Sequence, residues 1–70
     1  MQFTIPLMEK LSQFELEVTH EDFAKCFGET LGYHLLGKFC NEYNYSIIRL
    51  YQNLSPQNKE KLVAYINKLS

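Results

Sequence analysis

Two histidines and two cysteines are the side chains of this 70-residue sequence best suited to metal binding or nucleophilic attack: His20, Cys26, His34 and Cys40. Zinc sites usually contain a close pair of ligands, separated by about two to four residues, whereas successive members of this set lie six, eight and six positions apart. A nucleophilic cysteine needs an adjacent base that a third group orients, and neither histidine has such a sequence context. We therefore expect no metal site, no cofactor and no catalytic residue, and we expect both cysteines to be buried thiols.

The two cysteines also form the candidate pair for a disulfide. On one continuous helix, Cys26 and Cys40 would lie about 21 Å apart, which is too far for a bond, so a disulfide would need a break in the helix or a second subunit. The sequence contains neither a nucleophile elbow nor a glycine-rich phosphate loop. Its carboxylates cluster at predicted helix starts, where the helix dipole stabilises them. The sequence therefore predicts a protein that is not an enzyme.

The length of the chain fits one domain, and we expect a single all-α domain over residues 1–70. A core of this size contributes only about 3–5 kcal/mol of stability, so close helix packing or a second copy must add to it. The start of the sequence is not basic, and no apolar run is long enough for a signal peptide or a membrane span. With reduced thiols, these features predict a cytoplasmic protein that does not enter a membrane.

Charge is divided unevenly between the two halves of the chain. The formal net charge is −1, which argues against strong nonspecific attraction to nucleic acid. Residues 1–35 carry six acidic and two basic side chains, a net charge of −4, whereas residues 36–70 carry five basic and two acidic side chains, a net charge of +3. The two halves either balance each other between packed helices of one molecule or attract a second copy or a partner.

Cap residues and apolar spacing predict a compact bundle of four or five short helices. Pro6 suits a first helical turn, and the apolar spacing after it predicts a first helix over about residues 6–17. Thr19 is a suitable N-cap, with Asp22 in the capping-box position, so a second helix should start near His20.

The C-terminal helices are predicted from similar start signals. A short apolar helix should begin within residues 44–46, and Ser55 followed by Pro56 marks the start of the last helix. This last start signal is the clearest helix boundary in the sequence.

A row of large apolar side chains recurs at every fourth position through the middle of the sequence: Phe23, Phe27, Leu31, Leu35, Phe39 and Tyr43. Such a row drifts by about 40° per step around an α-helix, so one straight helix cannot bury it against one partner. We expect a break at residues 28–30, with Gly28 as C-cap and Thr30 as the next N-cap, and a third helix to about residue 43. The alternative is one kinked helix with a stripe of small residues for close packing, formed by Ala24, Gly28 and Gly32.

The sequence contains five Phe and five Tyr, which exceed what one small core can bury. We expect the surplus on a surface that pairs with another helix, because Tyr is typical of protein interfaces. The predicted interface residues are Leu31, Tyr33, Leu35, Leu36, Phe39, Tyr43, Tyr45 and Tyr51. This surplus favours a small regulatory or adaptor protein that binds another protein and forms a homodimer.

A second interpretation comes from the order of elements around the second helix. A short helix is followed by a cap at Thr19, a small residue at Ala24 and a glycine at Gly28. In these features residues 7–54 resemble the helix-turn-helix of phage-repressor-like DNA-binding domains, which are compact and all-α. The second half of the motif differs, because positions that are apolar in the family hold Glu29, His34 and Gly37.

The resemblance implies an alternative function, a transcriptional regulator that reads DNA with its third helix. Residues that the resemblance would place at the DNA are Thr30, Tyr33, His34 and Lys38. A recognition helix presents polar and basic side chains to the major groove, whereas this segment is rich in Leu and Phe. We therefore keep protein binding as the first interpretation and DNA binding as the alternative.

Overall fold

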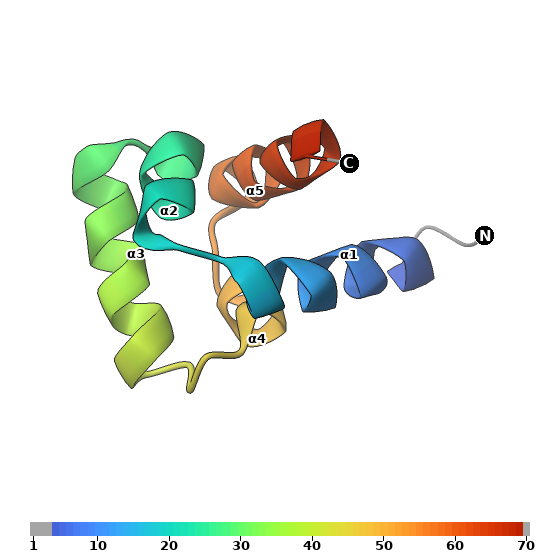
Figure 1. Cartoon of the computed structure of the whole chain (residues 1–70), viewed down its shortest axis with the longest axis horizontal. Coiled ribbons are helices and arrows are strands. Elements are labelled where there is room, and N and C mark those ends of the chain that lie inside the picture. Colours follow the sequence, from blue (N-terminus) through green and yellow to red (C-terminus); the bar gives the residue numbers. More distant parts are fainter. Residues whose placement is uncertain (1–3, 70) are drawn as a thin grey trace.

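Five helices follow one another in the computed structural model of the protein, which describes residues 4–69 (Figure 1). They are α1 (Thr4–Glu17), α2 (His20–Phe27), α3 (Glu29–Asn41), α4 (Ile47–Gln52) and α5 (Pro56–Leu69). No strand occurs within this range. The prediction of a small all-α bundle is therefore confirmed. None of the helices in residues 4–69 is long and apolar enough to cross a lipid bilayer.

The start of α2 follows the predicted capping box. The hydroxyl of Thr19 accepts a hydrogen bond from the Asp22 backbone N–H at 3.3 Å, and the Asp22 carboxylate accepts one from the Thr19 backbone N–H at 2.9 Å. Two backbone donors that a helix start leaves unpaired are thereby satisfied. The predicted start of α5 is also confirmed, because the Ser55 hydroxyl accepts a hydrogen bond from the Asn58 backbone N–H at 3.2 Å.

A single residue, Gly28, separates α2 from α3. Its φ angle of +93° lies in the region that favours glycine, and its N–H donates to the carbonyl of Ala24 at 2.8 Å while its carbonyl accepts from Gly32 N–H at 2.7 Å. The predicted break is confirmed, and the single kinked helix is wrong. The predicted cap at Thr30 is also wrong, because Gly28 caps both helices and α3 begins at Glu29.

The break lets both parts of the four-residue row face the same core. Among the side chains described, those of residues 6–69, the core contains eleven buried apolar ones: Leu11, Phe14, Phe23, Phe27, Leu35, Phe39, Ile47, Leu50, Leu54, Leu62 and Ile66. At its centre the Phe23 ring lies 6.1 Å from the Phe27 ring and 5.6 Å from the Phe39 ring, between centroids. More residues of the four-residue row are therefore buried in the core than we predicted from the sequence.

The corner between α3 and α4 contains two consecutive residues in the left-handed conformation, Asn44 at φ 55° and Tyr45 at φ 60°. The Tyr45 N–H donates to the carbonyl of Phe39 at 2.9 Å, and the two rings meet edge to face at 5.4 Å. Because Asn44 and Tyr45 form a turn, α4 begins at Ile47, directly after its N-cap Ser46, which is the last residue of the predicted start region.

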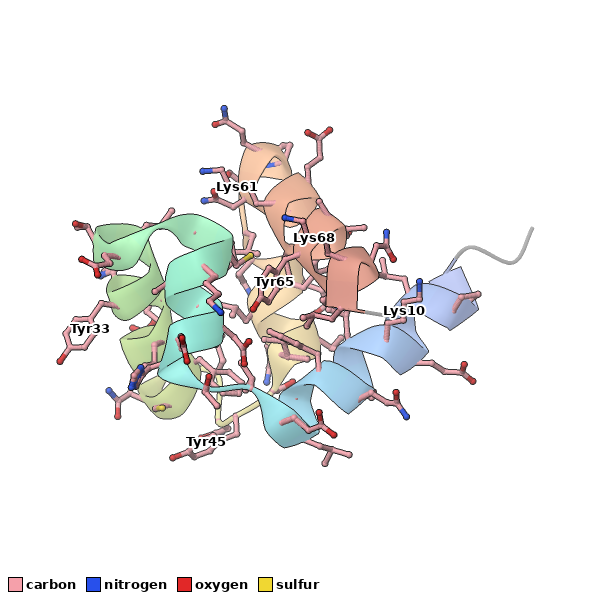
Figure 2. All side chains as sticks on the ribbon, turned by 45° about the horizontal axis from the view of Figure 1, so that its top comes forward. Lys10, Tyr33, Tyr45, Lys61, Tyr65 and Lys68 are labelled. Atoms are coloured by element: carbon pink, nitrogen blue, oxygen red, sulfur yellow. The ribbon has the colours of Figure 1, made fainter. Side chains whose placement is uncertain are left out.

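Side-chain hydrogen bonds join helices that are distant in sequence. The Glu15 carboxylate of α1 accepts the Ile47 backbone N–H at the start of α4, at 2.7 Å. The Lys10 ammonium donates to the Asn67 side chain of α5, also at 2.7 Å. In Figures 1 and 2, α3 lies at one end of the molecule with α2 beside it, and α1 extends toward the other end. The bundle therefore has one outer surface on α3 and another on α1.

Candidate functional site: the groove between α2 and α3

A groove of about 660 Å³ opens between α2 and α3 on the surface of the bundle. It is lined by His20, Ala24, Glu29, Thr30, Tyr33 and Leu36, and we call it the α2–α3 groove. Two of these residues come from α2 and four from α3. The faces of α2 and α3 that point away from the groove carry residues buried in the core. Packing in the core, and not a loop, therefore fixes the shape of the groove.

The spacing of α2 and α3 depends on Gly32, which is buried at the contact between them. A Cβ atom at this position would lie 2.4 Å from the carbonyl oxygen of Phe23 and 2.9 Å from the Cα atom of Ala24, closer than such atoms approach one another. The two backbones are therefore in direct contact here. With Ala24 facing the groove, α2 contributes only a methyl group where a larger side chain would fill the space.

Tyr33 is the most prominent side chain of the groove. It is 79% exposed and points away from the bundle (Figure 2). Leu36, one turn later on α3, is half-buried and packs against the core with part of its side chain. A projecting aromatic ring thus lies beside a hollow with apolar walls, and both features belong to one surface.

Both signs of charge occur on the two helices that form the α2–α3 groove. On α2, the Lys25 ammonium lies 3.7 Å from the Glu21 carboxylate, and both side chains are largely exposed. Glu29 lines the groove at the start of α3, and on that helix Lys38 forms an ion pair with Glu42 at 3.2 Å. Neither ion pair within residues 4–69 joins the acidic half of the chain to its basic half. Direct ion pairs between packed helices therefore do not account for the uneven charge.

The structure separates the predicted interface residues into three groups. Leu35 and Phe39 are buried in the core, so their assignment to an interface is corrected. Leu31, Leu36, Tyr43 and Tyr51 are half-buried and pack against the core. Only Tyr33 and Tyr45 are mainly exposed, and Tyr45 lies at the α3–α4 corner, apart from the groove lining.

Of the predicted interface residues, only Tyr33 and Leu36 line the α2–α3 groove. Ala24 was expected only at a close contact between helices, and neither His20 nor Glu29 was expected in a site. All three line the groove because α2 and α3 run side by side after the one-residue turn. That proximity follows from tertiary packing, and periodicity alone did not indicate it.

Residues that the DNA-binding alternative would use lie on the exposed side of α3. Thr30, Tyr33 and His34 are exposed, whereas Lys38 is half-buried and donates to Glu42. The one basic residue of this set is therefore already paired, and Glu29 lies in the same helix turn as Thr30.

The residues that could react or bind metals do not assemble into one centre. Within residues 4–69, no three His, Cys, Asp or Glu side chains gather as a metal site requires. Cys26 and Cys40 are both free and half-buried, which excludes a disulfide between them in this conformation. Burial raises the pKa of the Cys26 thiol to about 12, so it stays protonated at neutral pH and is a weak nucleophile.

A polar network links α2 to α5 next to this thiol. The Tyr65 hydroxyl donates to the Asp22 carboxylate at 2.7 Å, while the other carboxylate oxygen accepts from Thr19. Burial alone would raise the pKa of Asp22, but the hydrogen bonds from Tyr65 and Thr19 outweigh it and lower that pKa. Burial and the same hydrogen bond raise the pKa of Tyr65 to about 12, so its hydroxyl remains a donor at neutral pH.

We expect Tyr65→Phe to reduce the free energy of unfolding by about 1 kcal/mol at pH 7. The substitution removes the hydrogen bond to the charged Asp22 carboxylate, and the partial exposure of this bond to water reduces its contribution. Because the folded state lowers the pKa of Asp22, this contribution is present above the ordinary aspartate pKa and is lost as the pH falls through the lowered value. Urea titrations of both proteins between pH 2 and 7 measure it. The control is Tyr33→Phe, whose hydroxyl lies on an exposed ring. A Tyr65→Phe difference that stayed constant across this range would contradict the assignment to Asp22.

Comparisons with protein-family models, with curated proteins and with solved structures find no match to this chain.

Proposed function

We propose that this protein is a non-catalytic, cytoplasmic regulatory or adaptor protein that acts by binding other polypeptides, and that it forms a homodimer through the α2–α3 groove. The observation that carries the proposal is the 79% exposed ring of Tyr33 beside the hollow at Ala24 and Leu36. In a two-fold dimer the same surface serves both subunits, so Tyr33 of each copy enters the groove of the other. Tyr is also among the residues that contribute most to binding energy at interfaces.

The distribution of charge supports a second copy as the occupant. The groove region carries both basic and acidic side chains, with Lys25 near the end of α2 and Glu29 at the start of α3. In a two-fold arrangement, the basic residue of one copy can approach the acidic residue of the other, in both directions at once. A stable dimer needs about 800 Å² of buried surface on each partner, against 4990 Å² of total surface here, so neighbouring parts of α2 and α3 must join the contact.

The alternative function, duplex DNA binding through α3, has weaker support. Its candidate contacts include one lysine, Lys38, which already forms an ion pair with Glu42. Glu21 and Glu29 lie on the same pair of helices and would repel a phosphate backbone. The experiments below also test DNA binding.

Sedimentation equilibrium tests the dimer directly. We expect a wild-type mass near twice 8.3 kDa and a melting temperature that rises with protein concentration. Tyr33→Ala should raise the dissociation constant about 30-fold or more, which corresponds to the loss of about 2 kcal/mol at an interface hot spot. The matched control is Leu69→Ala, which truncates a 58% exposed side chain on α5 and should leave the mass unchanged.

A wild-type protein that stays at 8.3 kDa over the whole concentration range would refute the homodimer. If that monomer also bound duplex DNA with an affinity that fell steeply with salt, the DNA-binding alternative would replace the proposal.

A further inference from the structure

The outward face of α1 carries apolar side chains that the α2–α3 groove leaves unexplained. Leu16 is 83% exposed, the highest value among the large apolar residues described, and Met8 on the same helix is 46% exposed. The core-facing residues of α1, Leu11 and Phe14, lie on the side of the helix opposite Leu16, as the spacing of 3.6 residues per turn requires, and Met8 lies between the two sides. Leu16 therefore adds nothing to the core of this molecule.

A second hollow accompanies this face. A groove of about 720 Å³ lies between α1 and α4 and is lined by Met8, Glu9, Lys10, Ser12, Gln13 and Ile48. Ser12 is the small residue midway between Met8 and Leu16, four positions from each, so the three form one stripe along α1. A large side chain of a partner helix can enter above Ser12, between the two apolar ones.

Two glutamates lie near this stripe, Glu9 in the groove lining and Glu17 next to Leu16 in the sequence, against one lysine, Lys10, which also lines the groove. Glu9 and Glu17 are exposed on α1, and neither ion pair in residues 4–69 involves this helix. The one lysine of the helix, Lys10, donates its ammonium to Asn67 of α5. The carboxylate of Glu15 is occupied by the backbone of Ile47. Glu9 and Glu17 are thus available to a basic partner.

We propose that the outward face of α1 binds a basic amphipathic helix of another protein. Leucine or isoleucine side chains of that helix pack between Met8 and Leu16, and lysine or arginine side chains at its edges face Glu9 and Glu17. The two grooves share no lining residue, and α1 begins at the end of the molecule away from α3 (Figure 1). A dimer formed through the α2–α3 groove would therefore leave the α1 face of each copy open. The proposal does not require the dimer.

Fluorescence anisotropy with a designed peptide tests this surface. The probe is a labelled 18-residue helix with Leu at positions i, i+4, i+7 and i+11 and Lys on both flanks, and its counterpart carries Glu in place of every Lys. We expect the basic peptide to bind and the acidic one to bind at least about 10-fold more weakly. Leu16→Ser should weaken binding of the basic peptide by about 10-fold or more. The double variant Glu9→Gln, Glu17→Gln should reduce both the affinity for this peptide and the dependence of that affinity on salt.

Leu69→Ser is the matched control, because it removes an exposed leucine from α5, and it should leave peptide binding unchanged. Absence of binding, equal binding of both peptides, or binding that Leu16→Ser does not alter would each overturn the proposal. Tyr33→Ala distinguishes the two surfaces, since it should disrupt the dimer and leave peptide affinity unchanged. If Leu16→Ser converted a dimer to a monomer, the α1 face would be the self-association surface, and this proposal would fail.

Discussion

Gly32→Ala should destabilise the protein by about 2–3 kcal/mol, although alanine is the better helix former. The added methyl group would lie 2.4 Å from the Phe23 carbonyl oxygen and 2.7 Å from its carbon, and both are backbone atoms that cannot rotate away. Either α2 and α3 move apart or the turn at Gly28 distorts. Because a core of this size supplies about 3–5 kcal/mol, the loss would remove much of the total stability.

Gly37→Ala is the matched control on the same helix. A Cβ atom at Gly37 would meet no other atom within 4 Å, so the substitution brings only the gain in helix propensity. We expect it to stabilise the protein by about 1 kcal/mol. Urea unfolding followed by circular dichroism measures both variants. Equal effects of the two substitutions would show that α2 and α3 do not touch at Gly32.

Leu50→Ala should reduce the free energy of unfolding by about 2–5 kcal/mol. Leu50 is completely buried in α4, and the same core contains residues of the other four helices. Truncation removes apolar surface from the core and leaves a cavity that surrounding side chains can fill only in part. At the upper end of this range the protein would be largely unfolded at 25 °C.

Leu16→Ala is the control for that experiment, since it makes the same chemical change at a position that is 83% exposed. We expect its effect on stability to lie within about 0.5 kcal/mol of zero. A large loss on truncating Leu16 would show that the α1 face is covered in solution, and the concentration dependence of the melting temperature would identify a second copy as the cover.

The sequence predicted those features of the fold that depend on local chemistry. Thr19 and Ser55 mark helix starts through hydrogen bonds to backbone groups a few residues away, and glycine at position 28 allows the left-handed turn. The cap at Thr30 was predicted wrongly because one residue, Gly28, ends α2 and starts α3. Whether Gly28 or Thr30 caps α3 depends on how closely α3 folds back on α2.

The candidate site was less predictable than the fold. Spacing shows which side chains share a helix face, but it does not show which face the rest of the chain covers. We therefore assigned Leu35 and Phe39 to an interface, whereas the packing of α3 against the other helices buries both in the core. For Leu16 a signal was present in the sequence, because it lies away from the apolar stripe that contains Leu11 and Phe14.

The one-residue connection at Gly28 also has a consequence for the order of folding. The contact between Phe23 and Gly32 joins positions only nine residues apart, whereas the Tyr65–Asp22 bond spans 43 residues. Loop-closure entropy makes the longer connection less favourable by about 1.4 kcal/mol in a flexible chain. We expect α2 and α3 to pair early, in the microsecond to millisecond range of helical proteins, and α5 to dock onto this hairpin afterwards. The helices that form the groove would then also be the nucleus around which the remaining chain assembles.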